Sequence, residues 1–149
     1  PLVTKTNGAM GQLDLPRRHA LCRKYQGSVQ SVGDAVAALS DSIRQGKYRA
    51  DHDSGVILIH KKDLVWRLCM VLSEAGKGSV VLTAQKVARL WHHGSYAELL
   101  ERRPELDAWL LKQGGNGQGR VIATLYRDPE QFSAAQLLSS LDVVISESK

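Results

Sequence analysis

The sequence predicts a mainly α-helical domain with small antiparallel β-hairpins, an α+β fold of the winged-helix kind. Apolar residues recur at helical spacing over residues 34–45. A turn rich in Asp, Ser and Gly over 51–55 then leads into an aliphatic run, which favours a strand. A wide apolar helical stripe with basic residues at its start follows over 64–72. The order of helix, hairpin and basic helix is typical of winged-helix and helix-turn-helix modules that bind nucleic acid.

The composition is that of an ordinary globular protein. The 149 residues are 43% hydrophobic and 23% charged, which indicates one domain or two small, closely packed ones. Lys and Arg outnumber Asp and Glu by 20 to 15, and the net charge of +5 favours polyanions as partners. Because the chain has one Phe, three Trp and four Tyr, its core must consist mostly of Leu, Val, Ala and Ile.

The cysteines and the hydropathy indicate a cytoplasmic protein. Cys22 and Cys69 lie far apart and have no zinc-binding spacing, so we expect two reduced core thiols. No apolar run approaches the roughly 20 residues that cross a bilayer, and no signal peptide precedes the domain. We therefore expect neither membrane association nor export. Because the chain begins at Pro1, we also expect a fragment of a longer polypeptide with an accessory function.

The first half of the chain is predicted to hold three helices and one strand. Residues 1–13 lack periodicity and are expected to be a flexible lead-in. A helix follows over 15–25, with an Asp before it as N-cap and a Pro in its first turn. A second helix is predicted over 34–45, capped by Asp34. A strand is predicted over 56–60, and a largely buried third helix over 64–72.

The second half repeats this succession of helices, a Gly-rich turn and a strand. The predicted elements are helices over 84–93, 96–101, 104–113 and 133–141, a Gly-rich turn over 114–119, a strand over 121–126 and a polar tail over 142–149. The domain over 14–141 is either two packed winged-helix units, 14–76 and 80–141, or one larger unit with two hairpins. No residue-level repeat relates the two halves.

The chain carries no motif for independent chemistry. The glycines over 114–119 lack the Gly-Lys-Ser/Thr ending of a nucleotide-binding loop, so we expect a hairpin tip or mobile wing. The turn Asp51-His52-Asp53 has ligand atoms for a metal, but such carboxylates more often bond the backbone of their own turn. No nucleophile elbow and no His-Glu-x-x-His pair occurs. The sequence therefore predicts no cofactor, no metal site and no enzymatic activity.

Three segments, 39–48, 54–61 and 64–68, carry a resemblance to a known family. They are similar to the C-terminal winged-helix domain of conjugal-transfer nickase/helicase proteins, the relaxases of integrating conjugative elements, which are mobile elements. The similarity covers roughly residues 36–70. It implies a winged-helix fold and an accessory DNA-binding or partner-binding role in conjugation, with the nicking chemistry elsewhere.

The first functional hypothesis is an accessory nucleic-acid-binding module, with DNA as the expected ligand. Lys and Arg would contact phosphates, because each neutralised phosphate releases counterions and gives salt-sensitive affinity without sequence discrimination. For each of these residues a solvated surface position is the alternative. The candidate nucleic-acid-binding residues are Lys61, Lys62, Arg67, Lys86, Arg89, His93 and Arg120.

The alternative hypothesis is a protein–protein interaction domain that docks a replication, transfer or secretion component. An apolar helix face would provide the contact, although core packing explains the same residues. The candidate residues are Leu99, Leu100, Leu106, Trp109, Leu110 and Leu111. An exposed Trp109 would favour a protein partner, whereas basic side chains that converge on one face would favour nucleic acid.

Overall fold

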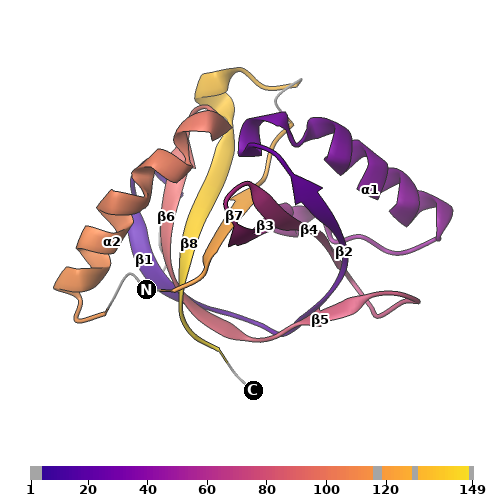
Figure 1. The fold of residues 1–149 in the computed structure, drawn as a ribbon, viewed down its shortest axis with the longest axis horizontal. Coiled ribbons are helices and arrows are strands. Elements are labelled where there is room, and N and C mark those ends of the chain that lie inside the picture. Colours follow the sequence, from indigo (N-terminus) through magenta and orange to yellow (C-terminus); the bar gives the residue numbers. More distant parts are fainter. Residues whose placement is uncertain (1–4, 116–118, 129–130, 148–149) are drawn as a thin grey trace.

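A computed structural model describes residues 5–115, 119–128 and 131–147. The eight described strands form one curled antiparallel sheet in the order β1-β6-β8-β7-β3-β4-β2-β5, with helices α1 and α2 on one side of it (Figure 1). We call that side the helix face and the other side the opposite face. The strands are β1 (Met10–Leu15), β2 (Arg18–Gln26), β3 (Val56–Lys62), β4 (Val65–Leu72), β5 (Val80–Leu82), β6 (Gln85–His93), β7 (Val121–Leu125) and β8 (Leu138–Glu147), and the helices are α1 (Gly33–Gln45) and α2 (Arg103–Lys112).

The two halves of the chain have the same arrangement of elements. The series β2, α1, β3, β4 corresponds to β6, α2, β7, β8, with β1 and β5 at the two edges of the sheet. The halves join where β3 pairs with β7. Gly27-Ser28 follows β2 and Gly94-Ser95 follows β6, and both glycines have a positive φ, 146° and 134°, that favours Gly. The sequence shows no residue-level repeat, so the two halves share their arrangement of elements without an evident repeat of residues.

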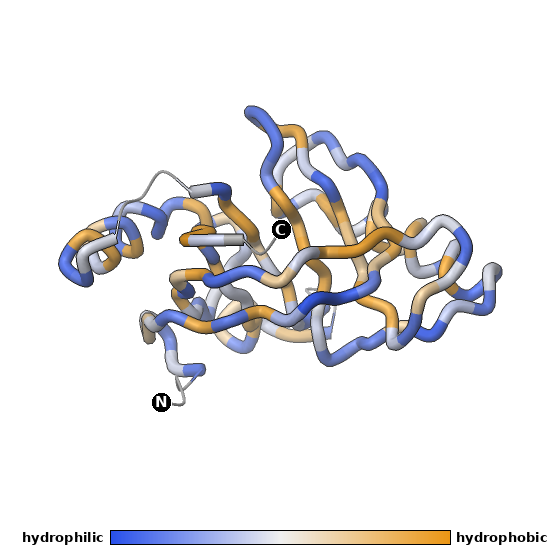
Figure 2. Tube along the Cα trace, turned by 90° about the horizontal axis from the view of Figure 1, so that it is seen from below, coloured by the Kyte–Doolittle hydropathy of each residue, from blue (hydrophilic) through white to orange (hydrophobic). Residues whose placement is uncertain are grey.

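The central strands are buried on both faces. On the helix face, Leu58, Leu68 and Leu141 pack in one cluster with α1 and α2, and on the opposite face Ile57 and Ile59 belong to a second cluster. All five residues of β7 are buried. Figure 2 shows the hydrophobic segments running along the strands. The sheet therefore separates two apolar layers.

Four of the predicted helices are wrong. The segments 15–25, 64–72 and 84–93 lie largely in β2, β4 and β6, and 133–141 holds a short 3₁₀ turn that leads into β8. Because the basic helix over 64–72 does not exist, the winged-helix prediction and the mainly α fold class are also wrong.

Burial on both faces explains these errors. In β4, Trp66 and Leu68 pack on the helix face, while Cys69 and Val71 pack on the opposite face. Apolar residues therefore do not alternate with polar ones along the strand, and their spacing resembles that of a buried helix. Periodicity does not distinguish the two structures when both faces of a strand are covered.

Two helices and two strands agree with the predictions. The helices over 34–45 and 104–113 are confirmed as α1 and α2, and the strands over 56–60 and 121–126 as β3 and β7. Asp34 lies in the first turn of α1, whereas Val32 occupies the N-cap position. Among the residues with a described placement, no helix is long and apolar enough to span a membrane.

Three further segments differ from the predictions or lie outside the described residues. The segment 96–101 forms two 3₁₀ turns, Tyr96–Glu98 and Leu100–Arg102. The predicted lead-in over 1–13 contributes β1, and the predicted tail over 142–149 continues β8. Within the predicted Gly-rich turn, residues 116–118 lie outside the described part of the chain.

A disulfide joins the two cysteines. Cys22 of β2 and Cys69 of β4 are directly opposite each other in the sheet, and the prediction of two reduced thiols is therefore wrong. The bond links positions 47 residues apart, for which loop-closure arguments give a stabilisation of about 4 kcal/mol. It holds together the two neighbouring strands of the first half.

An ion pair lies within the sheet on the opposite face. Asp142 of β8 is fully buried, and Arg89 of β6 donates to both of its carboxylate oxygens, from Nε at 2.7 Å and from Nη2 at 2.8 Å. Burial alone would lower the pKa of Arg89, but the charge and hydrogen bonds of Asp142 outweigh burial and raise it. Arg89 is therefore charged, and Asp142 is the carboxylate that compensates its charge.

We expect Asp142→Asn to lower the free energy of unfolding by about 3–5 kcal/mol, because the substitution leaves Arg89 as an uncompensated buried charge. Urea unfolding followed by Trp fluorescence at neutral pH measures the change. The matched control is Asp41→Asn, which removes an exposed ion pair with Arg44 and should cost less than about 1 kcal/mol. Equal losses in the two variants would contradict this account.

Candidate functional site

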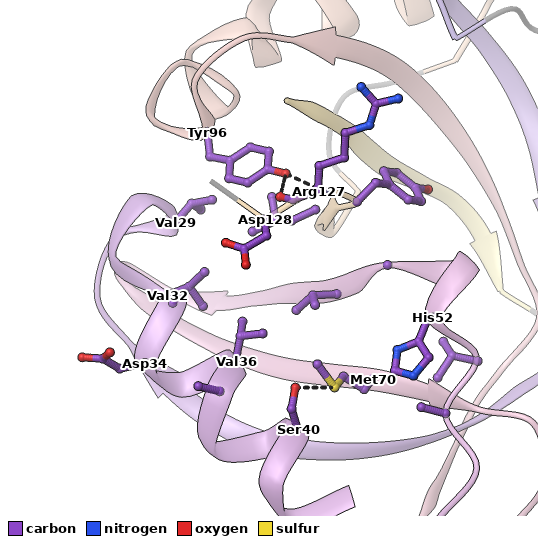
Figure 3. A pocket seen from close by; sticks show the side chains of 18 of the residues that line it. Val29, Val32, Asp34, Val36, Ser40, His52, Met70, Tyr96, Arg127 and Asp128 are labelled. Carbon is purple, nitrogen blue, oxygen red and sulfur yellow. Dashed lines mark hydrogen bonds between the residues drawn. The ribbon is translucent and has the colours of Figure 1, made fainter. Parts of the chain in front are cut away.

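A cavity lies on the helix face, between α1 and the ends of β3, β4 and β7. Its volume is about 650 Å³. We call it the helix-face cavity (Figure 3). Its apolar lining includes Val29, Val32, Val36, Val56, Met70 and Leu125, and its polar and aromatic lining includes Asp34, Ser40, Asp51, His52, Tyr96, Tyr126, Arg127 and Asp128.

The apolar wall comes from α1 and β4. Val36 and Ser40 lie one helical turn apart on α1, so both side chains face the same side. The Ser40 hydroxyl donates to the Met70 Sδ at 3.7 Å, which leaves the flexible Met side chain against the cavity. Val36 and Met70 are partly buried and pack on the helix-face core.

A glycine allows the two halves to meet beside the cavity. Gly55 precedes β3 and has a φ of 70°. A Cβ atom at this position would lie 2.9 Å from the Leu125 carbonyl oxygen of β7. A side chain here would therefore push β3 away from β7, and the cavity lies at this junction.

Tyr96 fixes the loop that follows β7. Its ring is buried, its hydroxyl donates to the Arg127 carbonyl oxygen, and the Arg127 backbone N–H donates to that hydroxyl at 3.1 Å. Burial raises the pKa of Tyr96, and hydrogen bonding to the Arg127 backbone opposes burial only in part. The phenol therefore remains neutral near pH 7, and its two hydrogen bonds determine where residues 127 and 128 lie.

The charged groups of the helix-face cavity have different orientations. Figure 3 shows the Asp128 carboxylate facing the cavity, whereas the side chains of Asp34 and Arg127 point away from it. The Arg127 guanidinium donates to the Gln136 carbonyl oxygen at 2.6 Å. Asp51 accepts from the Ser54 hydroxyl at 2.8 Å and caps its own turn. Asp128 is therefore the acidic group best placed to face a bound molecule.

This arrangement is suited to binding an organic cation. Apolar walls and aromatic rings exclude water from a bound hydrocarbon body, and a carboxylate beside them attracts positive charge. The described residues contain no group of His, Cys, Asp and Glu side chains arranged to hold a metal ion.

The residues predicted to bind nucleic acid do not form one surface. Lys61 and Lys62 are exposed at the end of β3, and Lys86 is exposed near the start of β6. His93 at the end of β6 lies 2.6 Å from the Lys5 carbonyl oxygen through its Nε2. Arg89 is held in the buried ion pair.

Arg67 and Arg120, the other two predicted residues, are brought together by the fold. Both line a second, smaller cavity on the opposite face of the sheet. The predicted protein-binding patch is largely core, because Leu99, Leu106 and Leu110 are fully buried.

No sequence pattern indicated the helix-face cavity. Tyr96 is separated in the chain from Tyr126 and Asp128, which follow β7, and only the fold brings the two segments together beside α1. The Asp51-His52-Asp53 turn was considered for a metal, and it instead lies at the cavity edge. The lining residues include three carboxylates, Asp34, Asp51 and Asp128, against one guanidinium, Arg127, and this balance in a basic chain becomes apparent only in three dimensions.

Comparison with known proteins identifies a fold and no family. No family model matches the sequence, and none of the curated proteins matches it either. The structure is similar to the crystal structure of the EcmrR C-terminal domain, with a TM-score of 0.80 and 12% identity over 93% of this chain and 98% of that one. EcmrR in a complex with DNA gives a TM-score of 0.77 and 11% identity over 92% of this chain, which spans only 57% of that protein.

Two other solved structures are less similar. SAV2435, described as bound to tetraphenylphosphonium, has a TM-score of 0.54 and 7% identity over 92% of this chain and 93% of that one. A hydrolase from Listeria innocua has a TM-score of 0.56 and 11% identity over 92% of this chain and 91% of that one. At these identities the similarities show the fold alone. They overturn the resemblance to winged-helix domains of conjugation proteins, together with the accessory nucleic-acid-binding function predicted from a winged-helix pattern with basic residues.

Because the pKa of Tyr96 is raised, its phenol should titrate at a higher pH than an ordinary tyrosine. Absorbance of the phenolate, followed from about pH 8 to about pH 12, should contain a component that titrates above the ordinary value of about 10. Because burial favours the neutral phenol, its contribution to stability is present below about pH 10 and is lost as the pH rises through the raised value. The late component should be missing in Tyr96→Phe and should persist in Tyr48→Phe. Its persistence in Tyr96→Phe would assign it to another residue.

Proposed function

We propose that this chain is a ligand-binding domain whose helix-face cavity holds a small, hydrophobic organic cation. The observation that carries the proposal is the chemistry of the cavity: apolar walls, two tyrosines and the Asp128 carboxylate that faces the cavity, in a chain whose net charge is +5. An acidic cavity in a basic protein does not follow from composition. It therefore favours a ligand of the opposite charge.

The cavity is large enough for such a ligand. Its volume of about 650 Å³ lies within the roughly 300–1,000 Å³ of pockets that bind drug-sized molecules. The walls formed by Val32, Val36 and Met70 would contact an apolar body. A cation with spread charge and weak hydration fits better than a compact ammonium ion, because partial burial costs it less.

Charge and aromatic contacts would act together in the cavity. The Asp128 carboxylate faces the cavity, and Tyr96 and Tyr126 line it. A cation near an aromatic face gains about 0.5–2 kcal/mol, with the larger values where water is excluded. Arg127 adds the opposing charge, but its guanidinium points away and bonds the backbone of residue 136.

The structural neighbours support a regulatory setting for this binding. SAV2435 is described as bound to tetraphenylphosphonium, a hydrophobic cation, and EcmrR as bound to DNA. This chain corresponds to the EcmrR C-terminal domain, which is part of that longer protein. We propose that this chain senses a ligand for a transcription regulator, with the DNA contacts made by another domain.

We propose binding without catalysis. The hydroxyls described in the helix-face cavity are used in structural bonds, Ser40 with the Met70 sulfur and Tyr96 with backbone groups of residue 127. A hydrolase would need a nucleophile within hydrogen-bonding reach of a base. The similarity to the Listeria innocua hydrolase concerns the fold and supplies no such pair to this chain.

Isothermal titration calorimetry with tetraphenylphosphonium tests the proposal. We expect micromolar binding to the wild-type chain and a loss of about tenfold, or 1.4 kcal/mol, in Asp128→Asn, because the variant keeps the shape of the side chain and removes its charge. Neutral triphenylphosphine oxide should bind more weakly than the cation.

Asp34→Asn is the matched control, since this aspartate lies at the same cavity but points away from it. Its affinity should stay within about twofold of wild type. Absence of binding at about 1 mM cation, or equal affinity in Asp128→Asn and wild type, would refute the proposed site.

A further inference from the structure

A second cavity lies on the opposite face of the sheet and has the opposite charge. Its volume is about 120 Å³. Three arginines from separate elements line it: Arg18 at the start of β2, Arg67 in β4 and Arg120 directly before β7. None of the described residues that line it is acidic. We call it the arginine cavity.

The carboxylate that acts on Arg18, that of Asp142, is already engaged. Asp142 interacts with Arg18 at a distance, but both of its oxygens accept hydrogen bonds from Arg89. Burial lowers the pKa of Arg18, and the positive charge of Arg89 lowers it further. The Arg18 Nε is buried and has no hydrogen-bond partner among the described groups. Arg18 is therefore a guanidinium with spare hydrogen-bonding capacity and insufficient negative charge nearby.

The floor of the arginine cavity is hydrocarbon. Ile57 and Ile59 of β3 and Ile122 of β7 line it, and each belongs to the buried cluster of the opposite face. Ile59 is paired with Arg67 on one side and with Ile122 on the other. Positive groups and aliphatic surface therefore adjoin each other in one small cavity.

We propose that the arginine cavity binds a small organic anion, a carboxylate with a compact apolar body. Guanidinium groups present paired N–H donors that match the two oxygens of a carboxylate. The isoleucines would contact the apolar body, which a bare inorganic anion lacks. The cavity is smaller than the roughly 300 Å³ of the smallest drug-sized pockets, so the anion must be small.

This proposal is independent of the helix-face cavity. The two cavities have no lining residue in common, and the β-sheet separates them. A cation bound on the helix face and an anion bound on the opposite face would therefore be recognised by different side chains. Failure of either proposal leaves the other intact.

Benzoate is the test ligand, and NMR titration of the uniformly ¹⁵N-labelled chain measures its affinity and location. We expect shifts of the amides in β2, β4 and β7 around the arginine cavity, and weaker binding by about tenfold in Arg67→Gln and in Arg18→Gln. Arg23→Gln is the matched control, because Arg23 lies on β2 but is exposed and does not line the cavity. Its affinity should equal that of wild type.

Two comparison ligands test the chemistry. Benzamide keeps the ring without the charge, and inorganic phosphate keeps charge without the ring, so both should bind at least about tenfold more weakly than benzoate. The proposal is wrong if benzoate does not bind at about 20 mM, if Arg18→Gln and Arg67→Gln both bind it like wild type, or if either comparison ligand binds equally well. If Arg18→Gln does not fold, the benzoate affinity of Arg67→Gln alone tests the proposal.

Discussion

The pairing of β3 with β7 is the constraint on which the rest of the structure depends. It joins two four-stranded halves into one sheet, from Val56 opposite Leu125 to Ile59 opposite Ile122. The strands at this junction are buried on both faces, and each consecutive residue from 57 to 59 belongs to the core. Because burial of an aliphatic side chain contributes about 1.5–3 kcal/mol, the residues of this junction stabilise both apolar layers.

Both candidate sites lie beside this junction, one on each face. The helix-face cavity opens at the start of β3 and the end of β7, where Gly55 lets the strands approach and Tyr96 positions Asp128. The arginine cavity lies on the same two strands from the other side. Side chains of successive strand residues point to opposite faces, so neighbouring residues serve different sites.

The sheet also separates charge. Carboxylates line the helix-face cavity, guanidinium groups line the arginine cavity, and the buried pair of Arg89 and Asp142 lies on the opposite face. Tyr126 connects these environments, because it lines the helix-face cavity and its hydroxyl lies 3.4 Å from the Arg89 Nη1. The net charge of +5 does not show this difference between the two faces of the sheet, because it is a sum over the whole chain.

The sequence by itself determined the elements that have one buried side or clear boundaries. Helix α1 has a single buried stripe, with Leu39 and Ile43 inward, and β3 follows a turn and consists of β-branched and aliphatic residues, so local pattern identified both. Only the tertiary structure decided that β2, β4 and β6 are strands, because a strand covered on both faces loses its alternation. The candidate sites were likewise decided by tertiary structure. Asp128 and Arg18 become candidate binding residues only because the fold places them beside residues that are far away in the chain. The sequence pattern does not show which strands pair.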